Sequence, residues 1–209
     1  MELVNQKQKS AFKTLQPTFG YKNPMQAPKV TKVIVSAGTG SFKDKKKSEL
    51  VAKRLALITG QKAAIRSAKK SIASFKLRAG DEVGFQVTLR GKRMEDFLTR
   101  LIHIAFPRTK DFRGLNPGSV DEMGNFSIGI REHTIFPETP DEELKDVFGM
   151  SVTVVTSAKT KAESLALLKH LGFPLKKEAE KREAKAKRKR VRMAKTAVAP
   201  AQAAAAPAK

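Results

Sequence analysis

The sequence predicts an α+β fold, a two-layer sandwich in which a largely antiparallel β-sheet carries helices mainly on one face, followed by a basic C-terminal extension. The first observation is the alternation in residues 85–90, where Phe, Val and Leu alternate with Gln, Thr and Arg. The second is the helical spacing of the apolar residues from Met94 to Ala105. The third is the order of the expected elements, helix-strand-helix-strand-strand-helix-strand-strand-helix, which combines hairpins with crossovers.

The N-terminal elements are a helix, a connector and a strand. Leu3–Leu15 is expected to be helical, with its end near Pro17 and Gly20. Two prolines within residues 21–28 exclude a helix, so this stretch is an extended or turning connector. The β-branched side chains of Lys29–Ala37 then predict a strand.

A second helix and a pair of strands follow. Asp44 can cap the helix, whose apolar residues fall on one side, and Gly60 ends it. Residues 61–91 are typical of two strands around a long loop. In the second of these strands, alternation places Phe85 in the core and Thr88 on an open, polar face of the sheet.

The second half of the chain supplies the remaining elements. The amphipathic helix that contains the apolar residues from Met94 to Ala105 should end at Pro107. A short strand is expected over residues 126–130, and an acidic loop around Pro137 and Pro140. Valines mark the last strand, and leucines mark the core side of the last helix: Val152, Val154, Val155, Leu165, Leu168 and Leu171.

The charge of the chain indicates a polyanionic partner. The 209 residues include 42 Lys and Arg against 20 Asp and Glu, for a formal net charge of +22. Nucleic acid is a commoner partner for such a chain than a membrane surface. The excess lies in the first half and in the tail, whereas residues 111–146 are net acidic. We therefore expect the basic parts to face phosphate, and residues 111–146 to face either a basic protein or solvent.

Several classes of function find no residues to support them. The chain has no Cys and three scattered histidines, so disulfides and metal sites are not expected. No apolar run reaches the ~18–20 residues of a membrane span, and the first thirty residues lack the apolar core of a secretory signal. Gly38 and Gly40 follow a strand, but Lys43 occupies the third glycine position of a dinucleotide site. We expect no enzyme, no metal and no cofactor.

The composition divides the chain into three regions. Residues 1–174 are expected to form a single domain, enough to bury one core. Residues 175–195 are rich in Lys, Arg, Glu and Ala with i,i+4 charge pairs, which predicts a basic helical extension. Residues 196–209 are mostly Ala and Pro, which predicts a disordered tail.

The loop within residues 67–80 is the strongest candidate for RNA contact. It combines cations, hydroxyls and an aromatic ring in a connection longer than an ordinary hairpin turn. Phe75 could stack on a base or ribose. The alternative is that Phe75 and Leu77 pack into the core while the lysines are solvated.

Several dispersed strings resemble the bacterial-type ribosomal protein L5 family, the 5S rRNA-binding proteins of the large subunit. They occur in the family's order along the core from about residue 20 to residue 174. The strings are YKNPMQAP (21–28), KVTKVIVSAGTG (29–40), ITGQK (58–62), AKKSIASFKLR (68–78), VTLRGKR (87–93), PRTKDFRGL (107–115), GNFSIGIREHTIFPE (124–138), GMSVTVVTSAK (149–159) and LGFP (171–174). The fold that the resemblance implies, an antiparallel sheet with helices mainly on one side, agrees with the element order above.

The resemblance implies a 5S rRNA site on the sheet. Family members place an Asn, a Gln and a Thr there, and the matching positions are Ser36, Gln61 and Thr88. Ser36 departs from the family Asn, and its shorter side chain favours contact through a bridging water. The implied 5S rRNA-binding set is Asn23, Met25, Gln26, Lys32, Ser36, Gln61, Lys62, Thr88 and Arg90.

The resemblance also implies contacts elsewhere in a cytoplasmic ribosome. The long loop corresponds to one that reaches the elbow of P-site tRNA, through Lys69, Lys70, Ser71, Phe75, Lys76 and Arg78. The acidic stretch after Asp111 corresponds to the side that faces protein S13 of the small-subunit head. Further implied partners are 23S rRNA and other proteins of the central protuberance. The basic tail exceeds the usual family length and could follow rRNA.

Two other interpretations stay open at this point. One is a basic protein that binds nucleic acid without specificity, compacting DNA or lying on a membrane surface through its tail. The other is a nucleotide-binding enzyme that uses Gly38 and Gly40. Removal of the tail should abolish binding in the first case, and a nucleotide-dependent thermal shift would indicate the second.

Overall fold

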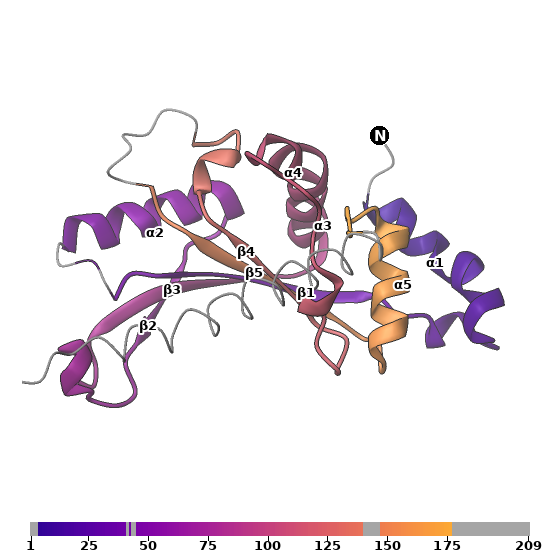
Figure 1. Ribbon diagram of the computed structural model, residues 1–209, viewed down its shortest axis with the longest axis horizontal. Coiled ribbons are helices and arrows are strands. Elements are labelled where there is room, and N and C mark those ends of the chain that lie inside the picture. Colours follow the sequence, from indigo (N-terminus) through magenta and orange to yellow (C-terminus); the bar gives the residue numbers. More distant parts are fainter. Residues whose placement is uncertain (1–3, 41, 43–44, 140–146, 177–209) are drawn as a thin grey trace, which may run out of the picture. The chain divides into compact units, whose positions relative to one another are not determined.

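The computed structural model describes residues 4–40, 42, 45–139 and 147–176 (Figure 1). Its elements follow the predicted order of helices and strands. The helices are α1 (Val4–Phe19), α2 (Lys45–Thr59), α3 (Gly91–Arg100), α4 (Phe106–Arg108) and α5 (Lys161–Leu171). The strands are β1 (Val30–Gly38), β2 (Ala64–Ser67), β3 (Glu82–Leu89), β4 (Phe126–Ile130) and β5 (Met150–Thr156). The predicted cap Asp44 and the tail beyond Lys176 lie outside the described residues.

The five strands form one antiparallel sheet in the order β2-β3-β1-β5-β4. The predicted α+β class and antiparallel pairing are therefore confirmed. β1 is the central strand, and its Ser36 lies opposite Gln86 of β3 and Ser151 of β5. This register brings together residues that are more than a hundred positions apart in the sequence.

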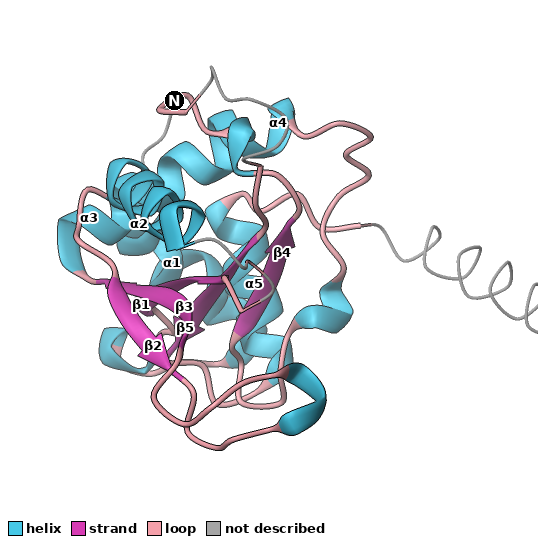
Figure 2. Ribbon diagram, turned by 90° about the vertical axis from the view of Figure 1, so that its left-hand side faces the viewer, coloured by secondary structure: helices cyan, strands magenta, loops and turns pink. Residues whose placement is uncertain are grey.

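One face of the sheet is buried against helices. Val33, Val35, Val87, Val152 and Val154 are at most 1% exposed. Helix α2 packs on β3 and α3 packs on β1, while α1 contacts α3 and α5. Figure 2 shows α2 and α3 on the same side of the strands. Burial of these β-branched side chains adds to the apolar stabilisation of the fold.

The predicted end of the third helix at Pro107 is wrong, because the helical path continues to Arg108. Residues Leu101–Ala105 form a π-helical turn, in which the Phe106 N–H bonds to the Leu101 carbonyl, and α4 follows directly. Pro107 lies close to the end of this continuous path, because Thr109 already has an extended backbone with a ψ of 126°.

Two other helices depart in detail from the prediction. Helix α1 continues past Leu15 to Phe19 and contains Pro17 in its last turn. Gly20 closes it with a positive φ of 66° and an N–H bond of 2.8 Å to the Gln16 carbonyl. In α5 the buried side is Ser164, Leu167, Leu168 and Leu171, whereas Leu165 is only half-buried. These four residues have the i, i+3, i+4, i+7 spacing of one helix face. The prediction used leucine positions only and therefore missed the buried Ser164.

Candidate RNA-binding surface

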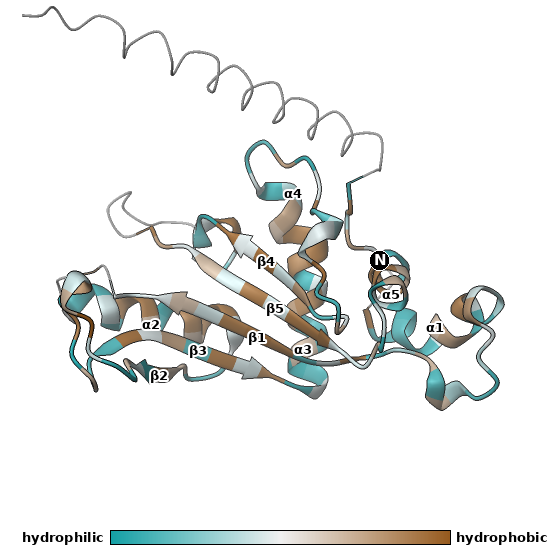
Figure 3. Ribbon diagram, turned by 60° about the horizontal axis from the view of Figure 1, so that its bottom comes forward, coloured by the Kyte–Doolittle hydropathy of each residue, from teal (hydrophilic) through white to brown (hydrophobic). Residues whose placement is uncertain are grey.

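The second face of the sheet, called here the open face, carries hydroxyl and amide side chains. Figure 3 turns this face toward the viewer, with α2 behind the strands. Strand parity places on it every second residue of each strand. Its polar members are Lys32, Ser36, Gln86, Thr88, Ser127, Ser151 and Thr153. The half-buried Ile34 lies between Thr88 and Thr153 and gives the face an apolar centre.

Two hydroxyl pairs cross this face. The Ser36 and Ser151 Oγ atoms are 2.8 Å apart, and Ser127 Oγ is 3.2 Å from Thr153 Oγ1. Ser151 Oγ also donates to the Ser36 carbonyl at 3.5 Å, so in this pair the hydroxyl lone pairs are what stay available to a ligand. Ser36, the residue at the family Asn position, therefore belongs to a pair of hydroxyls.

The other three hydroxyl residues of these pairs were not among the predicted site residues. Ser127, Ser151 and Thr153 alternate with buried residues in β4 and β5, and this alternation was the available signal. Arg66 of β2 was also missed. Its Nε donates to Gln86 Oε1 at 2.5 Å, which adds a cation to the same edge of the face.

The structure brings Lys32, Ser36 and Thr88 together on the open face, where alternation had placed Thr88. Gln61 and Lys62 lie instead in the connector between α2 and β2, with Gln61 half-buried and Lys62 exposed. The Gln61 carbonyl accepts a hydrogen bond from Thr59 Oγ1 at 3.1 Å. Arg90 is exposed between β3 and α3.

The other three predicted 5S rRNA residues form a turn before β1 rather than part of the sheet. Asn23 caps the 3₁₀ turn Pro24–Gln26, and its Oδ1 accepts from the Met25 N–H at 3.1 Å. Gln26 Oε1 accepts from the Lys22 N–H at 3.0 Å. Both amide oxygens therefore stabilise the turn, which presents Met25 with 88% of its surface exposed.

The loop between β2 and β3 is a small ordered hairpin. Ile72 and Leu77 exchange two backbone hydrogen bonds of 3.0 and 3.3 Å around the turn Ala73–Phe75. At its base the Ala68 N–H bonds to the Asp81 carbonyl at 2.8 Å. The hairpin lies at the end of the sheet away from α1 and α5 (Figure 1).

The side chains of this hairpin point to the surface. Phe75 is 71% exposed, so the alternative in which it packs into the core is wrong, and Leu77 is half-buried. Ser71 Oγ accepts from the Ala79 N–H at 3.0 Å and thus has a structural role. The same hairpin carries four exposed cationic side chains, called here the hairpin cations: Lys69, Lys70, Lys76 and Arg78.

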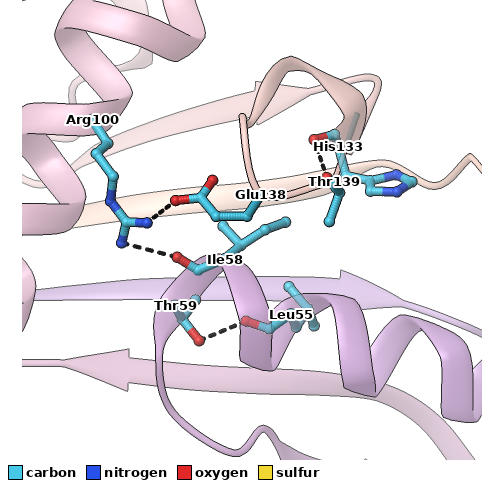
Figure 4. A network of polar contacts seen from close by, with 7 residues as sticks. All are labelled: Leu55, Ile58, Thr59, Arg100, His133, Glu138 and Thr139. Carbon is cyan, nitrogen blue, oxygen red and sulfur yellow. Dashed lines mark hydrogen bonds and ion pairs between the residues drawn. The ribbon is translucent and has the colours of Figure 1, made fainter. Parts of the chain in front are cut away.

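A polar network holds the end of the acidic stretch against the helices (Figure 4). Arg100 of α3 pairs with the Glu138 carboxylate and donates from Nη2 to the Ile58 carbonyl at 3.1 Å. Thr139 Oγ1 donates to the His133 carbonyl at 3.3 Å. Glu138 is thus engaged within the molecule and contributes no free charge to a basic partner.

Within the described ranges, no group of three or more His, Cys, Asp or Glu side chains could hold a metal ion. Among those same residues no helix is both long and apolar enough to cross a membrane. The chemistry that the open face and the hairpin offer is hydrogen bonding, stacking and charge pairing, which are the means by which proteins hold RNA.

Comparisons with known proteins match most of the chain to one family. Residues 23–78 match the family "Ribosomal protein L5", and residues 82–175 match the model of the C-terminus of the same ribosomal family. Large ribosomal subunit protein uL5 of Alkaliphilus oremlandii is 48% identical over 160 residues, covering 76% of this chain and 89% of the relative. The uL5 protein of Dictyoglomus turgidum is 45% identical over 179 residues, covering 85% of this chain and all of the relative. From these matches and the fold, the chain belongs to the ribosomal protein L5 family.

Proposed function

We propose that the open face of the sheet holds 5S rRNA in the cytoplasmic large ribosomal subunit. As a member of the L5 family, the chain is a structural, rRNA-binding constituent of that subunit and not an enzyme. The observation that carries the more specific proposal is the open face itself. Thr88, Ser36 and Ser151 lie there in adjacent strands, and none of the three side chains is buried in the core.

The chemistry of this face suits an RNA backbone. Hydroxyl side chains both donate and accept, so they can bond to phosphate oxygens and to the 2′-hydroxyl that distinguishes RNA from DNA. Lys32 adds positive charge on the face and Arg66 adds it at the β2 edge, while Lys62 and Arg90 add it in the connectors that flank β2 and β3. Neutral contacts then supply specificity, and the cations supply attraction that depends on salt.

The hairpin suits a second RNA partner. Its exposed Phe75 and the hairpin cations form a compact unit at one end of the sheet, and we assign them to the elbow of P-site tRNA by the family resemblance. We assign the acidic stretch after Asp111 to the side of S13, and leave contacts with 23S rRNA and neighbouring proteins of the central protuberance to other surfaces. Glu138 is excluded from the acidic surface by its pairing with Arg100.

The three regions of the chain take separate parts in this proposal. Residues up to Pro174 form one compact unit, to which we assign the 5S rRNA interaction. We assign residues 175–195 to a basic extension along rRNA and residues 196–209 to a tail without a fixed partner.

A binding competition tests the proposal. The full chain is titrated with labelled 5S rRNA against excess tRNA and duplex DNA at about physiological salt. Thr88→Val removes one hydroxyl at constant shape and should weaken 5S binding about two- to tenfold, the value of one hydrogen bond. Thr18→Val, an exposed threonine at the end of α1, serves as the matched control.

Two outcomes would contradict the proposal. Equal binding of all three nucleic acids would favour the non-specific basic protein instead. If the chain prefers 5S rRNA but Thr88→Val binds it with unchanged affinity, the open face is not the surface that contacts 5S rRNA.

A further inference from the structure

A pocket separate from the open face lies between α1, the turn before β1, and α3. Its volume is about 360 Å³. Helix α1 contributes Lys9 and Phe12, the turn and connector contribute Pro24, Pro28 and Lys29, and α3 contributes Glu95. Predictions from single elements could not find this site, because its walls come from three segments that meet only in the fold.

The walls of the pocket are fixed without a ligand. The turn is held by the capping bonds of Asn23 and Gln26, and by the Ala27 N–H bond to the Pro24 carbonyl at 3.2 Å. The Lys29 N–H donates to Ser157 Oγ at 2.9 Å, and the Lys29 carbonyl accepts from the Ser157 N–H at 2.9 Å. The backbone is therefore preformed, which limits the entropy lost on binding.

The side chains of the pocket combine three kinds of contact. Phe12 is half-buried and, with two prolines, offers flat apolar surface. The exposed Lys9 and Lys29 place positive charge at the rim. Glu95 is a half-buried carboxylate whose side chain makes no hydrogen bond or ion pair with another described residue.

We propose that this pocket binds one unpaired guanine of 5S rRNA. The base would lie against Phe12, and its N1–H and exocyclic N2–H would donate to the two oxygens of Glu95. Lys9 and Lys29 would neutralise the flanking phosphates. A carboxylate repels the phosphates of RNA and can only accept hydrogen bonds. The favourable contact that Glu95 can make with RNA is therefore with the N–H donors of a base. The inference rests on the proposed function, since the connector leads from the pocket into β1 and to Lys32 of the open face.

Neutralising Glu95 distinguishes a guanine acceptor from a plain surface charge, because only the first explanation predicts that 5S rRNA affinity falls. If Glu95 accepts from guanine, Glu95→Gln lowers 5S affinity about three- to tenfold, because an amide presents only one acceptor oxygen. If Glu95 is only a surface charge, the same substitution leaves affinity equal or raises it, since it removes repulsion. Asp96→Asn is the matched control, because Asp96 is the next residue of α3, is exposed and does not line the pocket.

A second variant tests the aromatic wall while protecting the fold. Phe12→Leu keeps apolar volume but removes the ring face, and should weaken binding about fivefold or more if a base stacks there. Its melting temperature is measured in parallel, so that lost affinity at unchanged stability is attributed to the ring.

Crosslinking supplies the direct readout. 5S rRNA transcribed with 6-thioguanosine is irradiated in complex with the full chain, and the crosslinked tryptic peptides are mapped. We expect a crosslink in the peptide Ser10–Lys13, which contains Phe12. Glu95→Gln behaving as Asp96→Asn, or crosslinks confined to other peptides, would overturn the guanine site. If Thr88→Val still weakens binding in that case, the proposed function stands and only the pocket assignment fails.

Discussion

Two glycines of the sheet should respond in opposite directions to the same substitution. Gly84 of β3 is buried at the last pair of the β1–β3 ladder, where it lies opposite Gly38. A Cβ at Gly84 would lie 2.6 Å from the Ala37 carbonyl oxygen and 3.4 Å from the Gly38 Cα. Gly129 of β4 is exposed, and a Cβ there would meet no atom within 4 Å. Both changes reduce the entropy of the unfolded chain, but only the first creates a collision with backbone.

The expected magnitudes follow from these contacts. Overpacking costs about 1–3 kcal/mol, and loss of unfolded-state freedom returns about 0.4–1 kcal/mol. Gly84→Ala should therefore lower the free energy of unfolding by about 1–2 kcal/mol, while Gly129→Ala should raise it by about 0.4–1 kcal/mol. At about 2–4 °C per kcal/mol for a domain of this size, the melting temperatures should move apart by several degrees.

Thermal unfolding followed by circular dichroism, with urea titration as a second probe, measures both changes. A stabilising effect of Gly84→Ala would mean that β1 and β3 separate readily at this rung. A destabilising effect of Gly129→Ala would mean that the outer face of β4 is more crowded than its contacts indicate. Either result would refute the reasoning from Cβ distances.

Four further predictions address the network, the open face, the hairpin and the connector. Arg100→Met should destabilise the fold by about 1–2 kcal/mol by leaving Glu138 unpaired, and a double-mutant cycle with Glu138→Gln in urea should show positive coupling. Ser36→Asn should raise 5S affinity about two- to tenfold by lengthening the side chain toward RNA; an unchanged dissociation constant in filter binding would show that the hydroxyl pair already makes the contact. Neutralising the hairpin cations together should spare 5S binding but weaken P-site tRNA retention in reconstituted ribosomes, and lost 5S affinity would contradict their assignment. Burial and the nearby Glu163 charge raise the pKa of Tyr21 to about 12, so its contribution to stability is present below pH ~10 and is lost as pH rises through the folded-state pKa. Because Tyr21 is the sole tyrosine and the chain has no Trp, absorbance titration reports it directly, and Glu163→Gln should lower the value.

Strand parity explains why much of the fold was predictable from sequence. Alternation in residues 85–90 assigned Phe85 and Val87 to the core, and both are at most 5% exposed. The end of the third helix was not predictable in the same way. A proline such as Pro107 normally ends a helix. Here a π-helical turn precedes it, in which the Phe106 N–H bonds to the carbonyl five residues earlier, and the helical path continues through the proline. Leu101 and Ala105 of this turn are both fully buried, as the apolar periodicity indicates, but periodicity does not specify which carbonyl each N–H bonds to.

The open face was predictable one strand at a time but not as a surface. Parity placed Thr88 correctly, because it concerns a single strand. The pairing of Ser36 with Ser151 depends on the strand order, in which β5 lies between β1 and β4. No local pattern specifies that order. The pocket at Glu95 is a more extreme case, since three separate segments form it.

The arrangement of charge over these surfaces predicts how the two RNA contacts separate experimentally. Uncharged side chains, Ile34 with Thr88 and Thr153 on either side, occupy the centre of the open face, whereas the hairpin cations lie at one end of the sheet. Each phosphate contact adds about 0.7–0.9 to the slope of log affinity against log salt concentration. Substitution of a hydroxyl such as Thr88 should therefore lower 5S affinity by the same factor at every salt concentration. Substitution of Lys32 should flatten the salt dependence instead, so the two kinds of contact can be assigned from slopes even where their effects on affinity are equal.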